Sequence, residues 1–189
     1  TVRPDSKMGY AACEKALAGG NPSSGSVGAG TGATVGKICG MERAMKSGLG
    51  MYAVQLGELR MAAVVAVNAL GDIFDSSTGR KIAGLRTEDG TAFSDSCEEL
   101  WKMGQRENLF TGNTTIGAVI TNGKFNKAQM NKIASMTRNA YARCINPVGT
   151  MADGDSIYAA SAGEVEADLN VAGTLAAYVM ERAIVAAIR

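Results

Sequence analysis

The stretch Gly112-Asn113-Thr114-Thr115 runs directly into the apolar segment 116–121, in a protein that contains no histidine. Without imidazole, the usual general base for a serine, threonine or cysteine nucleophile is missing. One replacement is the α-amino group of the nucleophile itself, which titrates near ~7.7–8.0 and can accept a hydroxyl proton close to neutral pH. Because Thr114 is internal, this role requires that the chain be cut between Asn113 and Thr114.

A second candidate residue is Asn68, which ends the apolar run that begins at Met61. A buried asparagine must pair its amide, since an unpaired buried polar group costs ~1–3 kcal/mol. Asn68 can do so by capping a turn. It can also act as a side-chain donor to a developing oxyanion, a role worth ~3–4 kcal/mol in well-studied enzymes.

Two carboxylates, Asp153 and Asp155, are separated by a single glycine. They can point into a shared site, or they can simply shape a turn. The further ligands of a calcium loop are missing from this segment. In a site without histidine, carboxylates are natural partners to hold an ammonium or hydroxyl group of Thr114.

The segment Gly28-Ala-Gly-Thr-Gly32 resembles a nucleotide-binding loop. A phosphate cradle, however, requires backbone N–H groups that converge at a helix N-terminus, and residues 33–36 do not open a helix. We therefore interpret the segment as a glycine loop that packs against a strand or supplies oxyanion donors from Gly30, Thr31 and Gly32.

Composition describes one ordinary soluble domain, residues 1–189, with 46% apolar and 20% charged residues. The net charge is +1 and there is no long basic run, so we expect neither a nucleic acid nor a membrane as partner. The longest apolar run, 61–67, is far shorter than the ~20 residues that span a bilayer. Four separated cysteines without a CxxC motif predict no metal or other cofactor and a reducing, cytoplasmic location.

The hydrophobic pattern predicts an α/β layered fold, with a strand-rich first half and alternating strands and helices in the second half. We expect the 59–69 strand to be buried on both faces, because its valines and alanines are continuous. Asn126 and Gln129 predict a capping box, and Ser161 and Glu164 a second one that opens the last helix. The remaining expected elements are a helix capped by Asp5 through about 17, a loop at 21–32, short strands within 33–57, a turn at 76–80, a short helix within 94–105, a strand at 115–121, a helix through 144 and a strand at 155–160.

These segments together resemble the S58 (DmpA-like) family of self-processing aminopeptidases and amidases, which includes L-aminopeptidase/D-esterases, β-peptidyl aminopeptidases and a pantetheine-type hydrolase. The resemblance extends over essentially the whole chain, and the combination of motifs in this order is more specific than any one of them. The segments that carry it are 3–5 with 8–10, Gly28–Gly32, 67–72, Asn113–Gly117, and 146–148 leading to Asp153–Asp155.

The resemblance implies a precursor that cleaves itself into an α part, 1–113, and a β part, 114–189, within an αββα sandwich of the type found in DmpA and ornithine acetyltransferase. Thr114 would be the N-terminal nucleophile, and Asn113 would lie on the other side of the cleaved bond. Asn68 would stabilise the oxyanion. Asp153 and Asp155 match an orienting pair that some members build from serine and glutamate.

Family members typically form homo-oligomers, and their precursors begin with a longer N-terminal segment. We therefore expect the N-terminal part of the family domain to lie outside this sequence and to be a partner of it. The predicted function is that of an N-terminal-threonine hydrolase, an aminopeptidase, amidase or esterase that acts on small peptides or amino-acid amides through an acyl-enzyme. Asp153 or Asp155 is the candidate base for self-cleavage. The alternatives are an acyltransferase of the ornithine acetyltransferase type and an uncleaved, non-catalytic scaffold of the same fold.

Overall fold

The computed structural model describes residues 3–20, 22–104 and 112–188. Its elements, in chain order, are α1 (Ser6–Leu17), the 3-10 helix η1 (Gly28–Gly30), β1 (Thr34–Val35), β2 (Met45–Lys46), β3 (Leu49–Leu56), β4 (Leu59–Asn68), β5 (Asp72–Asp75), β6 (Arg80–Ala83), α2 (Ser96–Met103), β7 (Thr114–Gly123), α3 (Lys127–Cys144), β8 (Ile145–Asn146), β9 (Ser156–Val165) and α4 (Leu169–Ala186).

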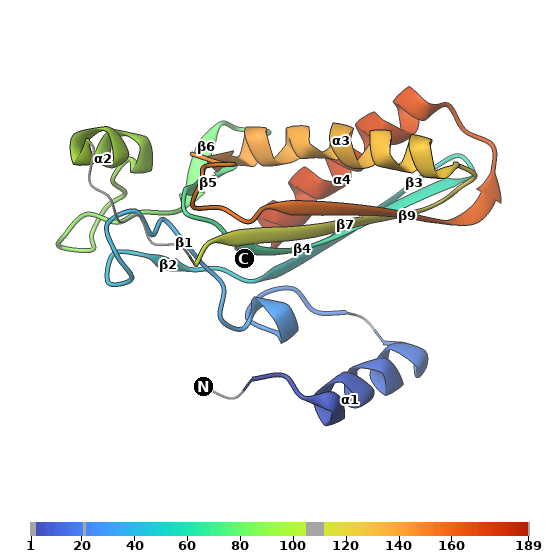
Figure 1. Cartoon of the computed structure of the whole chain (residues 1–189), viewed down its shortest axis with the longest axis horizontal. Helices are drawn as coiled ribbons and strands as arrows, with labels where there is room; N and C mark the ends of the chain where they lie inside the picture. The colour runs from blue at the N-terminus through green and yellow to red at the C-terminus, as the bar shows by residue number, and fades with distance from the viewer. Residues whose placement is uncertain (1–2, 21, 105–111, 189) are drawn as a thin grey trace.

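The main sheet has the strand order β3-β4-β7-β9. The pairs β3–β4 and β4–β7 are antiparallel, whereas β7 and β9 are parallel and are connected through α3. Parallel neighbours need such a crossover connection, and a helix is its usual form. Helices α3 and α4 lie side by side on one face of this sheet (Figure 1). The order β6-β5-β8 forms a smaller sheet at one end.

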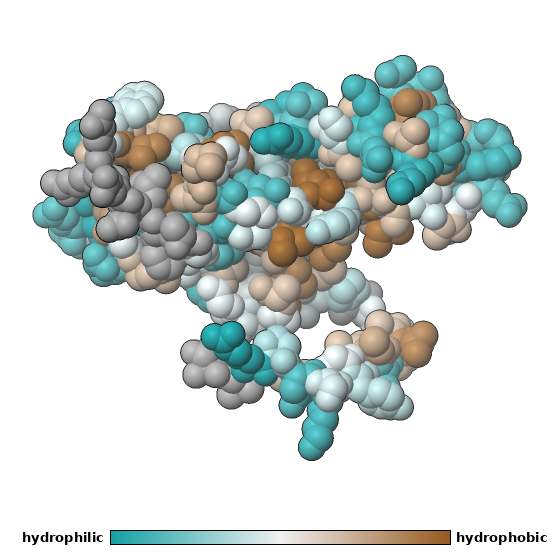
Figure 2. Space-filling model, viewed as in Figure 1, coloured by the Kyte–Doolittle hydropathy of each residue, from teal (hydrophilic) through white to brown (hydrophobic). Residues whose placement is uncertain are grey.

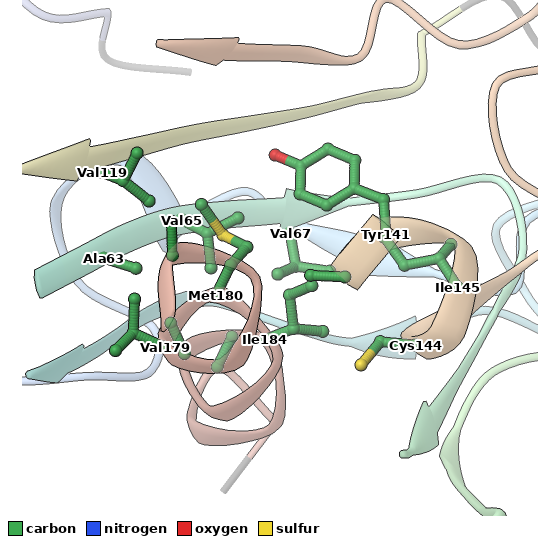
Figure 3. Packing of buried hydrophobic residues seen from close by; sticks show 14 of the residues in the cluster. Ala63, Val65, Val67, Val119, Tyr141, Cys144, Ile145, Val179, Met180 and Ile184 are labelled. Atoms are coloured by element: carbon green, nitrogen blue, oxygen red, sulfur yellow. The ribbon is translucent and has the colours of Figure 1, made fainter. Parts of the chain in front are cut away.

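The core lies between the sheet and these two helices. Alternate residues of β4 are buried and meet Met180 and Ile184 of α4 and Tyr141 of α3 (Figure 3). Helix α4 approaches β3 so closely that a Cβ on Gly50 would lie 1.8 Å from the carbonyl oxygen of Ala183. A glycine is therefore required at this point of the helix–sheet contact.

The expected capping box at the start of α3 is confirmed. The side chain of Asn126 accepts from the N–H of Gln129 at 3.0 Å, and the Gln129 side chain accepts from the N–H of Asn126 at 2.9 Å. The two reciprocal bonds satisfy N–H groups that have no partner within the helix. Helical spacing in this segment also predicts one face made of Met130, Ile133, Ala134, Thr137, Ala140, Tyr141 and Cys144. All of these residues are buried except Ala134, which is half-buried.

The second expected capping box, Ser161 with Glu164, is wrong. Residues 161–165 belong to β9, which continues to pair with β7 as far as Gly123 and Val165. The last helix is capped instead by Asp168, whose carboxylate accepts from the N–H groups of Asn170 and Val171. Strand pairing over these residues thus displaces the helix start beyond Ser161.

Strand β4 confirms the expected 59–69 strand, but the expectation that both faces are buried is wrong. Leu59, Met61, Ala63, Val65 and Val67 are buried, whereas the alternate residues are half-exposed except for Arg60, which is exposed. The reason is that α3 and α4 cover one face only. The opposite, open face carries small or apolar side chains, including the exposed Ile116 and Ile120 of β7.

Helix α1 forms where expected, and Asp5 caps it by accepting from the N–H of Met8 at 2.8 Å. It nevertheless buries none of its residues, so the side that Met8, Ala11, Ala12 and Ala16 were expected to form is exposed. In Figure 2 the N-terminal segment projects from the rest of the molecule, on the side of the open sheet face.

Helix α4 is the one helix in the described part of the chain that is long and apolar enough to cross a membrane, judged by length and composition. Half of that 18-residue window is buried inside the fold. The helix packs against α3, β3 and β4. We therefore assign α4 to the protein core.

Asp72 at the start of β5 holds three elements together. Its Oδ1 accepts from the N–H of Leu85 at 2.7 Å and the hydroxyl of Ser96 at 2.8 Å, and its Oδ2 accepts from the N–H of Ser96 at 3.0 Å. Oδ2 also pairs with the ammonium of Lys81 at 2.6 Å, and only 2% of the Asp72 side chain is exposed. Each oxygen of this buried carboxylate therefore accepts from two donors.

We expect Asp72→Asn to lower the free energy of unfolding by about 3–5 kcal/mol, the range typical for breaking a buried ion pair. Either orientation of the new amide would turn an NH₂ group toward two donors. Urea unfolding of the variant and the wild type measures this effect. The matched control is Glu166→Gln, because the pair of Glu166 with Lys124 is exposed and its loss should leave the unfolding midpoint unchanged. An unchanged midpoint for Asp72→Asn would contradict the structural role of this carboxylate.

Candidate active site

Two predicted site residues are brought together by the register of the main sheet. Asn68 at the end of β4 lies directly opposite Thr114 at the start of β7. Their neighbours Val67 and Thr115 point into the buried side of the sheet, so Asn68 and Thr114 lie on the open face. The predicted site is therefore at one end of the uncovered sheet surface.

The side chain of Asn68 is held by three described groups. Its Oδ1 accepts from the ammonium of Lys37 at 2.8 Å and from the N–H of Thr34 at 3.2 Å. Its Nδ2 donates to the carbonyl oxygen of Gly112 at 3.0 Å. The orientation of the amide thus points its donor toward the segment that leads into Thr114.

Lys37 is a further candidate site residue, which the sequence patterns did not indicate. Only 1% of the residue is exposed to solvent. Its ammonium also donates to the main-chain oxygen of Asn68 at 3.1 Å. Burial lowers the pKa of Lys37 to about 8, although the negative charge of Asp153 opposes this shift. A lysine with a pKa near neutral can release its proton and serve as a base.

The bond between Asn113 and Thr114 lies in a buried, hydrogen-bonded segment. The Thr114 hydroxyl donates to the carbonyl oxygen of Asn113 at 2.5 Å. The N–H of Gly154 donates to the same oxygen at 2.9 Å, and Asn113 pairs with Asp153 as a parallel β-bridge. The Thr114 hydroxyl is therefore turned toward the carbonyl group of the bond that precedes it.

The two carboxylates hold backbone groups near Thr114. Asp155 accepts from the N–H of Thr115 at 2.8 Å, and burial raises the pKa of Asp155. Asp153 accepts from both the N–H and the hydroxyl of Thr150, at 3.1 and 2.7 Å, and from the N–H of Leu70 at 3.5 Å. Asp153 thus binds the backbone just after β4, and Asp155 binds the start of β7. The charge of Asp153 also raises the pKa of Lys37.

The glycine loop packs against a strand, as expected. A Cβ on Gly30 would lie 2.1 Å from the backbone nitrogen of Leu49. The N–H groups of Gly30 and Thr31 donate to the carbonyl oxygens of Val27 and Gly28 within the 3-10 turn. Shortly after the loop, the N–H of Thr34 donates to the side chain of Asn68 and so connects this segment to the site. Gly32 is exposed. An oxyanion role for these residues stays a prediction.

The geometry assembles a hydroxyl, a buried lysine of lowered pKa, an amide donor and two carboxylates around one peptide bond. Such a set can activate a hydroxyl and stabilise the charge that develops on the attacked carbonyl. These are the elements of acyl transfer without histidine.

Solved structures with the same architecture define the class of fold. The L-aminopeptidase D-Ala-esterase/amidase from Ochrobactrum anthropi is described as a variant of the Ntn-hydrolase fold. It matches with a TM-score of 0.57 and 18% sequence identity, over 89% of this chain and 45% of that one. The predicted α/β class is confirmed, and the described residues supply one helical layer and one sheet layer of the expected sandwich.

The particular family follows from the sequence. The profile described as Peptidase family S58 matches residues 2–189, and the chain belongs to this family. An uncharacterized aminopeptidase of Mycobacterium leprae is 32% identical over 173 residues, which are 87% of this chain and 46% of that protein. A 6-aminohexanoate-oligomer endohydrolase of a Kocuria species is 32% identical over 172 residues, with the same two shares, 87% and 46%. The chain thus spans about half the length of the curated relatives it matches.

Proposed function

We propose that the chain is part of a self-processing N-terminal-threonine hydrolase that cleaves amide bonds in small substrates. The observation that carries this proposal is the contact between the Thr114 hydroxyl and the carbonyl oxygen of Asn113. Family membership supports the peptidase class. The names of the relatives support amino-terminal peptide bonds and 6-aminohexanoate oligomers as the substrate class.

The first reaction is cleavage of the chain itself. The Thr114 oxygen adds to the carbonyl carbon of Asn113, the C–N bond breaks, and the acyl group is left as an ester on Thr114. The proton of the hydroxyl passes through a base to the departing nitrogen, and water then hydrolyses the ester. We propose the neutral amine of Lys37 as this base, because burial lowers its pKa to about 8 and its hydrogen bond to Asn68 holds it beside the residue that lies opposite Thr114.

The second reaction is turnover of an external amide. The new α-amino group of Thr114 titrates near ~7.7–8.0 and can take the proton of its own hydroxyl. In the uncut chain Asn68 Nδ2 donates to Gly112, and withdrawal of that segment after cleavage would free this donor for the substrate oxyanion. An acyl-enzyme forms, and water releases the product.

The proposal includes an α part, 1–113, and a β part, 114–189, that stay together after the cut. The eight register pairs between β4 and β7 join these two parts across the main sheet. We also propose a cytoplasmic homo-oligomer and the N-terminal part of the family domain as a partner. The open sheet face beside Thr114 is the surface that such a partner would cover.

Intact-mass measurement and N-terminal sequencing of the purified protein test the proposal. We expect two polypeptides, one of which begins with Thr114. A chain that remains unbroken after prolonged incubation would instead favour the non-catalytic scaffold. Offering the cleaved protein water and a free amine as competing acceptors separates the hydrolase from the acyltransferase, since only the transferase would pass most of the acyl group to the amine.

A further inference from the structure

Gly154 contacts the bond that the proposed self-cleavage breaks. Its N–H donates to the carbonyl oxygen of Asn113 at 2.9 Å. This oxygen gains the negative charge when the Thr114 hydroxyl adds to the carbonyl carbon. A backbone donor that is already aimed at such an oxygen stabilises the charge without reorganisation.

The missing side chain of Gly154 also matters. A Cβ at this position would lie 2.7 Å from Thr114 Oγ1, but at the ordinary distances of 3.6 and 3.7 Å from Cγ2 and Cβ of the same residue. Gly154 is not among the glycines with positive φ, so its backbone conformation is open to other residues. A side chain at position 154 would therefore force the Thr114 oxygen out of its present position.

The flanking contacts keep Gly154 in place. Asn113 and Asp153 form a parallel bridge, and Asp155 accepts from the N–H of Thr115 at 2.8 Å. The segment 153–155 thus binds the backbone on both sides of Thr114. A shift of Gly154 away from the carbonyl oxygen would require these contacts to break.

We infer that Gly154 is an oxyanion-binding and positioning residue of the self-cleavage step, an inference that rests on the proposed function. Its N–H binds the Asn113 oxygen in the tetrahedral intermediate, while the bare Cα leaves room for the attacking oxygen. The intermediate collapses as the C–N bond breaks and the Thr114 nitrogen gains a proton. The ester then takes up water to give the Asn113 carboxylate and the free Thr114 hydroxyl.

The first test is the rate at which the intact chain of Gly154→Ala disappears, followed by mass spectrometry. We expect cleavage about 100-fold slower than in the wild type, because displacement of a reacting atom by about 1 Å has this effect. Gly9→Ala is the matched control, since Gly9 is exposed in α1 and an added Cβ would meet no heavy atom within 4 Å. Cleavage of Gly154→Ala within about threefold of the wild-type rate would overturn the positioning role.

A second variant separates crowding of the oxygen from general damage. Serine lacks the Cγ2 of threonine and rotates more freely about χ1, so Thr114→Ser should restore part of the rate lost in Gly154→Ala. The rate lost through Gly154→Ala is therefore measured twice, once in the chain with Thr114 and once in the chain with Thr114→Ser. If the cleavage rate falls by the same factor in both, the new methyl group does not act on the oxygen. Glycolic acid in place of Gly154 replaces the amide by an ester and so removes the N–H donor, and we expect about 10²–10³-fold slower cleavage. An unchanged rate there would overturn the oxyanion role.

The outcomes distinguish this inference from the proposed function. A wild-type chain that is never cut overturns both. A wild-type chain that is cut, together with a Gly154→Ala chain that is cut equally fast, overturns the positioning role of Gly154 and leaves the proposed function standing.

Discussion

Replacement of Thr114 by alanine is expected to leave the Asn113–Thr114 bond uncut and to abolish amide hydrolysis. The hydroxyl that contacts the Asn113 carbonyl is the attacking group in the first reaction, and the residue also supplies the nucleophile and the amine in the second. Intact-mass measurement should find a single chain in Thr114→Ala and two fragments in the wild type. An amide substrate should remain unhydrolysed by the variant.

Two neighbouring variants make this prediction specific. Thr114→Ser keeps a hydroxyl and should still be cut, although at a different rate. Thr115→Val is the matched control, because the Thr115 hydroxyl is buried without a hydrogen-bond partner in the part of the chain that the structure describes. Two fragments from Thr114→Ala would show that another group cuts the chain.

The features that the sequence predicted correctly depend on residues that are close together in the chain. The capping box of Asn126 and Gln129 depends on two side chains three residues apart, and both expected bonds form. The run from Thr114 into β7 is likewise a local strand pattern. The sheet register then brings Asn68 opposite Thr114, a relation that the family resemblance implied but that the local patterns did not contain.

Predictions failed where tertiary contacts decide between local alternatives. Ser161 and Glu164 have the spacing of a capping box, yet pairing with β7 extends β9 through this segment. Strand β4 has an apolar pattern typical of burial on both faces. Which faces are covered depends on the layers around it, and α3 and α4 cover only one.

Lys37 shows why part of the site could not be predicted. It follows Gly36 and precedes Ile38 in a glycine-rich region, and a single lysine in such a region has no pattern that signals burial. Its environment is created by Asn68, which is 31 positions away, and by Asp153. The only hint of burial in the sequence is that Lys37 stands between a glycine and an apolar residue. The same neighbours are also compatible with a turn on the surface.

The pH dependence of self-cleavage should report the titration of Lys37. The α-amino group of Thr114 does not exist until the chain is cut, so it cannot serve as the base in this step. A lysine must be deprotonated to accept a proton, and burial lowers the Lys37 pKa to about 8. The cleavage rate should therefore rise about tenfold per pH unit below this value and level off above it. Incubation of freshly purified precursor at a series of pH values measures the profile.

Substitutions at Lys37 and Asp153 decide whether this lysine is the base. Lys37→Arg keeps the positive charge but cannot deprotonate, so above about pH 8 cleavage should become about 10²–10⁴-fold slower and the rise in rate around that pH should be lost. The charge of Asp153 raises the Lys37 pKa, so Asp153→Asn should move the midpoint of the profile to lower pH while cleavage continues. If Lys37→Arg is cut at the wild-type rate and Asp153→Asn is not cut at all, the base is Asp153. The sign of the midpoint shift thus separates a lysine tuned by a carboxylate from a carboxylate that acts directly.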